Sequence, residues 1–237
     1  MKENLEKRNT GQSALDQSIR RRSFIKYTGL TTGVAMLTIA GCKEDDDNTP
    51  AAGTVDLGSG DIGILNYAYA LEQLEAAFYI SVASNGAFAT IFTAAEQTML
   101  KDIRDHEITH REFLKAALGD KAIADLEVDF SSVDFTKRDS VLATAKTFED
   151  LGVSAYNGAG NLITDPNYLL IAGKIVSVEA RHASAIRDMI NPKSADFAGD
   201  TVVDTNGFDG AKMPMEVLTA AGPFIKTKVT ANNLPTT

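Results

Sequence analysis

Two tetrapeptides of the form Glu-x-x-His constrain the fold of this chain more than any other feature. They are Glu107-Ile108-Thr109-His110 and Glu179-Ala180-Arg181-His182. Residues three apart on a helix leave the same face one turn apart, so each tetrapeptide places a carboxylate beside an imidazole. A single tetrapeptide of this kind arises often by chance. Its presence twice indicates that the chain is built from two related helical units.

Each tetrapeptide follows an earlier glutamate that has a tyrosine seven residues after it. Glu72 precedes Tyr79 in the first unit, and Glu149 precedes Tyr156 in the second. Four glutamates and two histidines that converge in a helical bundle form a ligand set for two adjacent metal ions. The predicted ligands are Glu72, Glu107, His110, Glu149, Glu179 and His182.

Apolar residues at steps of three and four predict four long helices. Their ranges are about 61–84, 93–118, 138–163 and 166–190. The predicted ligands lie on or beside the apolar stripes of these helices, which face the core. An unpaired buried charge costs several kcal/mol, whereas two divalent cations neutralise four carboxylates. Metal binding is therefore expected to support folding as well as function.

The connections between the helices predict how they pair. Short segments around residues 84–86 and 164–166 join antiparallel neighbours, and residues 119–137 are long enough to cross the bundle from end to end. We expect an all-α fold in which residues 61–191 form a four-helix bundle of two antiparallel pairs joined by a long crossover. Residues 192–237 are expected to add loops and a short helix that starts at Pro214 and ends before Gly222.

The N-terminal residues are predicted to direct export. Arg21-Arg22-Ser23-Phe24-Ile25-Lys26 resembles a twin-arginine signal, and the apolar stretch of about 27–40 is shorter than the roughly 20 residues of a membrane span. The segment Ile39-Ala40-Gly41-Cys42 resembles a bacterial lipobox with Cys42, the only cysteine, as the lipidated residue. We expect a signal peptide at 1–41 and an acidic flexible tether at 42–60. The mature protein is then lipid-anchored at the cell envelope, in the periplasm or on the outer surface.

The charge distribution argues against nucleic acid as a partner. The formal net charge is −9, and residues 1–41 hold seven basic and three acidic residues, so the remainder is more acidic still. Nucleic-acid binding requires a basic surface. An acidic body suits attraction of cations, although an ordinary solvated surface is the simpler explanation.

Three groups of residues carry a resemblance to the ferritin-like superfamily, in particular to exported ferritin-like domain proteins of the desiccation-related type. They are the segment Leu71-Glu72-Gln73-Leu74-Glu75-Ala76-Ala77-Phe78-Tyr79, the two Glu-x-x-His tetrapeptides, and Met213-Pro214-Met215-Glu216-Val217-Leu218. In architecture, the resemblance covers about 61–225. It implies two metal ions, each bound by one of the two histidines.

The resemblance also implies separate roles for the carboxylates. Glu72 and Glu149 match the terminal ligands, and Glu107 and Glu179 match the glutamates that bridge the two ions. His110 and His182 match the nitrogen ligands. Tyr79 and Tyr156 become candidates for hydrogen bonding to the ligating carboxylates, and they are the two candidate catalytic residues.

Two further residues compete for roles at the predicted site. Glu75 lies one turn after Glu72, but its counterpart in the second unit is Gly152, so symmetry favours Glu72 as the ligand. Glu75 is then expected beside the site or facing solvent. His106 completes the His-Glu-x-x-His pattern of zinc peptidases. Because the second Glu-x-x-His has no place in a peptidase, we assign His106 to support of the site or to packing.

The expected function is that of an exported di-metal carboxylate protein. Imidazole and carboxylate ligands accept iron, manganese or zinc, and we favour two iron ions, with manganese as the alternative. The leading hypothesis is oxidation of ferrous iron or reduction of peroxide, with dioxygen or peroxide as the partner. Two alternatives stay open: a manganese catalase-like enzyme, and a non-enzymatic protective lipoprotein with a structural metal site. A homodimer is also kept open.

Overall fold

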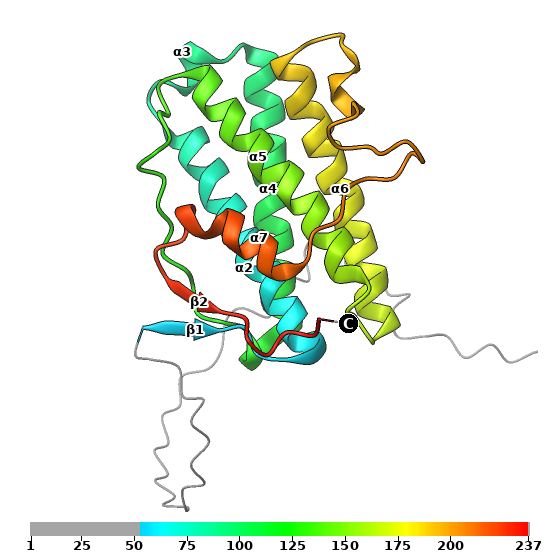
Figure 1. Ribbon diagram of the computed structural model, residues 1–237. Coiled ribbons are helices and arrows are strands. Elements are labelled where there is room, and N and C mark those ends of the chain that lie inside the picture. Colours follow the sequence, from blue (N-terminus) through cyan, green and yellow to red (C-terminus); the bar gives the residue numbers. More distant parts are fainter. Residues whose placement is uncertain (1–52, 237) are drawn as a thin grey trace, which may run out of the picture. The chain divides into compact units, whose positions relative to one another are not determined.

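The computed structural model describes residues 53–236, and four long helices form its centre. They are α2 (Gly60–Ser84), α4 (Ala94–Leu118), α5 (Arg138–Gly160) and α6 (Pro166–Ile190). α2 and α6 run in one direction along the bundle, and α4 and α5 run in the other (Figure 1). The all-α four-helix bundle is confirmed. The predicted signal peptide, Cys42 and tether residues 43–52 lie outside the described residues.

Local capping explains why the helices begin where the sequence predicts. At the start of α4, the Thr93 side chain accepts a hydrogen bond from the Glu96 backbone, and the Glu96 carboxylate accepts one from the Thr93 backbone. α6 begins with Pro166 in its first turn, after Asp165 caps the backbone of Asn167. The short C-terminal helix is also observed, as α7 (Pro214–Ala221).

A crossover of residues 119–137 connects the end of α4 to the start of α5 alongside α2 (Figure 1). Two buried side chains of α2 hold the backbone of the crossover in place. Asn66 accepts a hydrogen bond from the Ile123 backbone at 3.0 Å, and Gln73 accepts one from the Leu126 backbone at 2.7 Å. Buried backbone groups need such partners. The crossover therefore shields a face of α2 that would otherwise meet solvent.

The ordered body begins earlier than the sequence predicts. We expected a flexible tether as far as residue 60, whereas Thr54–Asp56 forms strand β1, which pairs in parallel with β2 (Lys228–Thr230). Leu57 is fully buried, and its backbone donates a hydrogen bond to Thr230. The pairing joins segments far apart in the chain, so no local pattern reveals it. A short helix, α3 (Phe88–Ile91), also interrupts the turn between α2 and α4.

Aromatic side chains form the part of the core between α2, α5 and the crossover. Phe78 packs edge to face against Phe148, with ring centroids 5.1 Å apart, and against Phe130 of the crossover. Such pairs stabilise a core beyond simple burial. Within residues 53–236, no helix combines the length and the apolar content that crossing a membrane requires.

Candidate metal centre

The structure brings all six predicted ligands together in the interior of the bundle. α2 contributes Glu72, α4 contributes Glu107 and His110, α5 contributes Glu149, and α6 contributes Glu179 and His182. The four glutamates are fully buried. Because each helix supplies its residues from near its middle, the cluster lies deep within the bundle.

The cluster consists of two groups that share two glutamates. Glu72, Glu107, His110 and Glu179 form one group, and Glu107, Glu149, Glu179 and His182 form the other. Within each group, one donor atom of every residue lies within 4.8 Å of the others. His110 Nδ1 is 3.0 Å from Glu179 Oε1, and His182 Nδ1 is 2.7 Å from Glu107 Oε1. Glu107 and Glu179 are therefore placed between the two imidazoles.

The two tyrosines hold the two glutamates that the groups do not share. The Tyr156 hydroxyl donates to Glu72 Oε1 at 2.5 Å, and the Tyr79 hydroxyl donates to Glu149 Oε1. Each tyrosine thus binds the glutamate of the other helix pair. The glutamate on its own helix is two turns away, about 10 Å along the axis, which is too far for a hydrogen bond. The hydrogen bonds expected from the resemblance are present, and they join the two halves of the bundle.

The unpartnered polar atoms of the cluster fit a pair of metal ions. Among the described residues, ten buried side-chain nitrogen and oxygen atoms have no hydrogen-bond partner, and eight belong to the six predicted ligands. These eight are Glu72 Oε2, both oxygens of Glu107, His110 Nδ1, Glu149 Oε2, both oxygens of Glu179 and His182 Nδ1. Leaving such atoms unsatisfied is costly. Carboxylate oxygens and imidazole nitrogens are donors that divalent transition metals bind.

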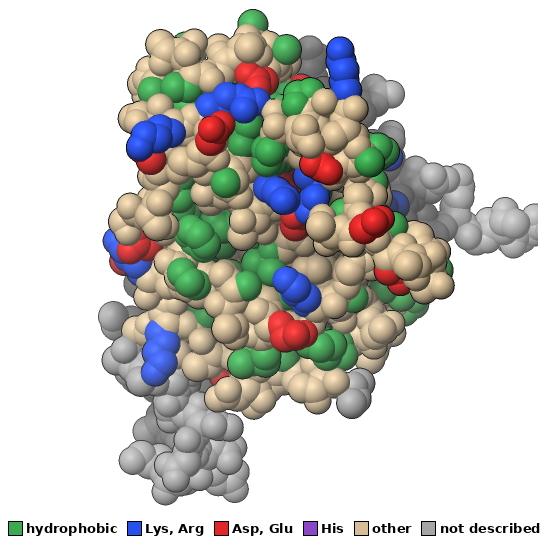
Figure 2. Space-filling model, turned by 45° about the horizontal axis from the view of Figure 1, so that its top comes forward, with side chains coloured by type: hydrophobic (Ala, Val, Ile, Leu, Met, Phe, Trp, Pro, Cys, Tyr) green, Lys and Arg blue, Asp and Glu red, His purple; other side chains and the backbone are tan. Residues whose placement is uncertain are grey.

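The carboxylates of the cluster lack the basic partners that several acidic groups at the described surface have. Glu96, for example, is paired with Arg138 at 2.6 Å, and Figure 2 shows acidic and basic side chains interspersed over one face of the molecule. Within residues 53–236, the four buried glutamates of the cluster form ion pairs with imidazoles alone. Two divalent cations would supply the positive charge that Lys and Arg provide at the surface.

Burial and mutual repulsion shift the protonation of the cluster when only protein groups are present. Burial, together with the charge of Glu179, raises the pKa of Glu107 well above its usual range, and burial raises the pKa of Glu149 to about 7. Burial opposes charge on His182, but the close carboxylates around it, Glu107 first, raise its pKa to about 12. His110 is raised to a pKa of about 12 in the same way. A metal ion must displace the protons that these groups hold.

Glu75 is buried beside the cluster and does not face solvent. It is 4% exposed and belongs to neither of the two groups. A Cβ atom built on Gly152 would lie 3.1 Å from Glu75 Oε1, so a side chain at that position would require the carboxyl group to shift by a few tenths of an ångström. Burial, reinforced by the surrounding glutamates, raises the pKa of Glu75 well above its usual range. Of the two placements that the sequence left open for Glu75, the structure shows the one beside the site.

His106 supports the cluster from its outer side. Its Nδ1 lies 2.9 Å from His182 Nε2, and the two rings are nearly coplanar, with an angle of 8° between them. His182 therefore directs Nδ1 to the carboxylates and Nε2 to His106. His106 belongs to neither group of clustered donors. The zinc peptidase interpretation, which needs His106 and His110 on one metal, has no support in this geometry.

Fold and site together define a class of protein: a four-helix bundle with a buried carboxylate and imidazole cluster suited to metal. The family profile of the ferritin-like domain matches residues 60–192, which is more than half of the chain. The chain belongs to the ferritin-like domain family. A comparison with curated proteins finds no match. The family assignment agrees with a metal site. It does not identify the metal or the reaction.

Proposed function

We propose that this protein is an exported di-iron carboxylate protein that oxidises ferrous iron with dioxygen or reduces peroxide. The observation that carries the proposal is the set of eight unpartnered donor atoms buried between the four helices. Two bound iron ions supply two one-electron donors side by side, as the two-electron reduction of dioxygen or peroxide requires. Manganese is the alternative occupant, since affinity order alone does not choose between them.

The donor atoms support distinct roles for the glutamates. Glu72 and Glu149 each give one oxygen to a tyrosine and keep the other free, which suits a terminal ligand. Glu107 and Glu179 keep both oxygens free and belong to both groups, which suits a bridge. We assign His110 to one metal position and His182 to the other.

The remaining residues of the site position these groups and exclude water. Tyr79 and Tyr156 restrict the rotation of the terminal carboxylates, as hydrogen bonds to ligands do in other metal sites. His106 orients the His182 ring through Nε2. The apolar side chains packed around the four buried glutamates keep bulk water from the centre, so the charges there act in a medium of low dielectric constant.

We also propose that the protein acts outside the cytoplasm. The twin-arginine string at Arg21-Arg22 and the lipobox that ends in Cys42 support export followed by lipid attachment. Both lie outside the described residues, so this part of the proposal rests on the sequence. Twin-arginine export suits a protein that folds and binds its metal before it crosses the membrane.

The decisive experiment is anaerobic loading of the protein with ferrous iron, followed by rapid mixing with dioxygen or with hydrogen peroxide. We expect near-ultraviolet absorption that saturates near two irons per chain. Two ferrous ions give two electrons, which with two protons convert one dioxygen to hydrogen peroxide, or one hydrogen peroxide to two waters. Metal analysis of protein from its native host identifies the natural ion.

Other outcomes of the same experiment would redirect the assignment. Sustained oxygen release from peroxide by the manganese form alone would indicate a catalase-like enzyme. If neither the iron form nor the manganese form responds to either oxidant, the redox proposal fails. The metal would then have a structural role.

A further inference from the structure

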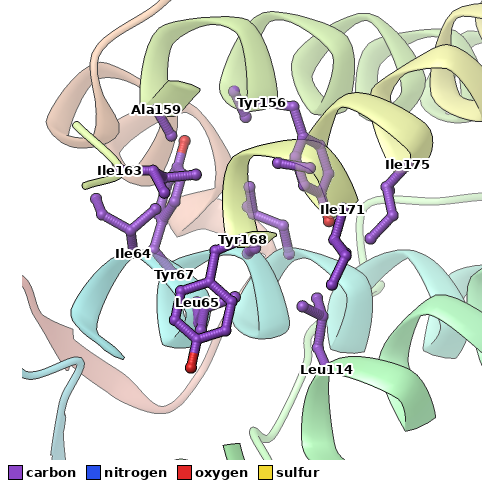
Figure 3. Close-up of a pocket in the computed structure, with 14 residues that line it drawn as sticks. Ile64, Leu65, Tyr67, Leu114, Tyr156, Ala159, Ile163, Tyr168, Ile171 and Ile175 are labelled. Atoms are coloured by element: carbon purple, nitrogen blue, oxygen red, sulfur yellow. The ribbon is translucent and has the colours of Figure 1, made fainter. Parts of the chain in front are cut away.

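An apolar pocket lies in the interior of the bundle, and Figure 3 shows the residues that line it. All four long helices contribute residues to it. Leu71 and Ile175 precede the ligands Glu72 and Glu179 in the chain, whereas Leu114 and Tyr156 follow the ligands His110 and Glu149. α2 and α6 run opposite to α4 and α5. Residues that precede the ligands on α2 and α6 therefore lie at the same end of the bundle as residues that follow the ligands on α4 and α5. The pocket is therefore the next layer of the interior below the ligands.

The lining of the pocket is apolar apart from tyrosine hydroxyls. Its side chains are those of leucine, isoleucine, alanine and tyrosine. The hydroxyl of Tyr156 is engaged by Glu72. The hydroxyl of Tyr67 is buried and has no hydrogen-bond partner among the described residues. Tyr168 is half-buried at the margin.

The size and chemistry of the pocket select a small apolar molecule. The cavity volume of the pocket, counted over the positions that the centre of a water molecule can take, is about 20 Å³. This is room for one such molecule. An ordered buried water needs two to four polar partners, and only the Tyr67 hydroxyl is free within the buried part of the lining. Peroxide has the same need for hydrogen bonds. A diatomic gas such as dioxygen does not need hydrogen bonds, so it gives up no hydrogen bonds with water when it enters an apolar site.

The pocket lies between the surface of the bundle and the layer that holds the predicted ligands. Ile163, Tyr168 and Ala172 at its outer part are half-buried, whereas Leu71 and Leu114 at its inner part are buried. In Figure 3 the Tyr156 ring points from α5 toward α2, where its hydroxyl meets Glu72. One side chain thus forms part of the pocket wall and holds a predicted ligand.

We propose that this pocket binds dioxygen and supplies it to the metal centre. The inference rests on the proposed function, and it selects dioxygen over peroxide as the oxidant. It also identifies a binding site that is formed by protein residues alone. The pocket can therefore be tested separately from the reaction.

The first test is xenon binding, because xenon enters apolar cavities without any metal chemistry. Crystals of the full metal-loaded protein under xenon pressure should show one xenon atom between Leu71, Tyr156 and Ile175. Xenon found only elsewhere, or nowhere, would overturn the proposal even if the protein oxidises iron.

The second test narrows the pocket at its half-buried margin, where a larger side chain is least disruptive to folding. Ala172→Leu should slow ferrous-iron oxidation by dioxygen about tenfold, while the rate with peroxide and the metal content stay unchanged. Ala122→Leu, at a half-buried position outside both the pocket and the cluster of donors, is the matched control and should change neither rate. Equal slowing with both oxidants, or no slowing, would contradict dioxygen delivery through the pocket.

The two tests separate this inference from the proposed function. If xenon binds at the pocket but iron reacts with neither oxidant, the proposed function fails and the supply of dioxygen fails with it. If iron is oxidised at the same rate in wild type and Ala172→Leu, and xenon does not bind, the proposed function stands and the pocket has no part in it.

Discussion

Glu72 and Glu149 each divide their oxygens between a tyrosine and the centre of the bundle, whereas Glu107 and Glu179 direct both oxygens inward. This division is the one that the proposed terminal and bridging roles would require. It also makes the two tyrosines part of the support of the site. Each tyrosine hydroxyl donates a hydrogen bond to a glutamate of the opposite helix pair. A change in one helix pair is therefore expected to affect the position of a carboxylate in the other.

The separation between ligands and supporting residues leads to a prediction on metal content. Glu107→Ala and His182→Ala should each remove most of the bound metal, because each deletes donors that face the centre. Both should also lower the melting temperature, since the remaining buried carboxylates lose a neutralising partner. The measurements are elemental analysis and calorimetry of the purified variants.

His106→Ala is the control for this prediction. It removes a hydrogen-bond partner of His182 without removing a donor from either group, so most of the metal should stay bound. A loss of metal from His106→Ala equal to that from His110→Ala would reopen the zinc peptidase interpretation.

At the level of elements, Glu75 of α2 packs against Gly152 of α5. The carboxyl group of Glu75 fills the space beside the glycine. We predict that Gly152→Ala lowers the free energy of unfolding, because the buried Glu75 carboxylate would have to shift by a few tenths of an ångström within a packed cluster, and this strain is expected to outweigh the roughly 1 kcal/mol that alanine gains over glycine in a helix interior. Chemical denaturation of the metal-loaded protein measures the change.

A double-mutant cycle distinguishes the effect of the contact between Glu75 and Gly152 from any general loss of stability on substituting Gly152. Glu75→Ala creates the missing space, so Gly152→Ala should cost less in that background than in the wild type. Equal costs in the two backgrounds would show that Glu75 does not limit the size of the residue at position 152.

At the scale of the whole molecule, the stability of protein stripped of metal by a chelator should depend on pH. The pKa of both His110 and His182 is raised to about 12 from the ordinary value of 6.5. A group whose pKa is higher in the folded chain than in the unfolded chain stabilises the fold fully when the pH is below its pKa in the unfolded chain. This stabilisation is lost as the pH rises toward its pKa in the folded chain. The raised pKa of Glu149, about 7, acts in the same direction.

We therefore predict that the melting temperature of the chelated protein falls from about pH 6 to about pH 9. The metal-loaded protein should show a weaker or opposite trend, because metal binding is favoured by neutral imidazoles and ionised carboxylates. Calorimetry of both forms across this range is the measurement. A chelated protein that becomes more stable as the pH rises would contradict the protonation of the cluster.

The location of the whole molecule gives a separate prediction. Cys42→Ser should release the protein from the membrane fraction, because the lipid on Cys42 is the proposed anchor. Arg21→Lys combined with Arg22→Lys should keep the protein in the cytoplasm, since the twin-arginine route requires the arginine pair. Fractionation and immunoblotting check both results. Membrane retention of Cys42→Ser would defeat the lipoprotein proposal.

The sequence by itself determined the four long helices and the six clustered side chains. Both depend on local spacing: apolar residues at steps of three and four define the core face of a helix, and Glu-x-x-His places two donors on one turn. The repetition of this spacing predicted that the donors converge. Capping residues such as Thr93 set the helix ends within a few residues for the same local reason.

Only the tertiary structure decided which distant residues meet. Tyr156 binds Glu72 of the other helix pair, Glu75 is buried against Gly152, and β1 pairs with β2 from the other end of the described chain. The apolar pocket likewise exists only where four helices meet. Each of these features depends on how helices and strands pack against one another, and a pattern within a single segment carries no record of that packing.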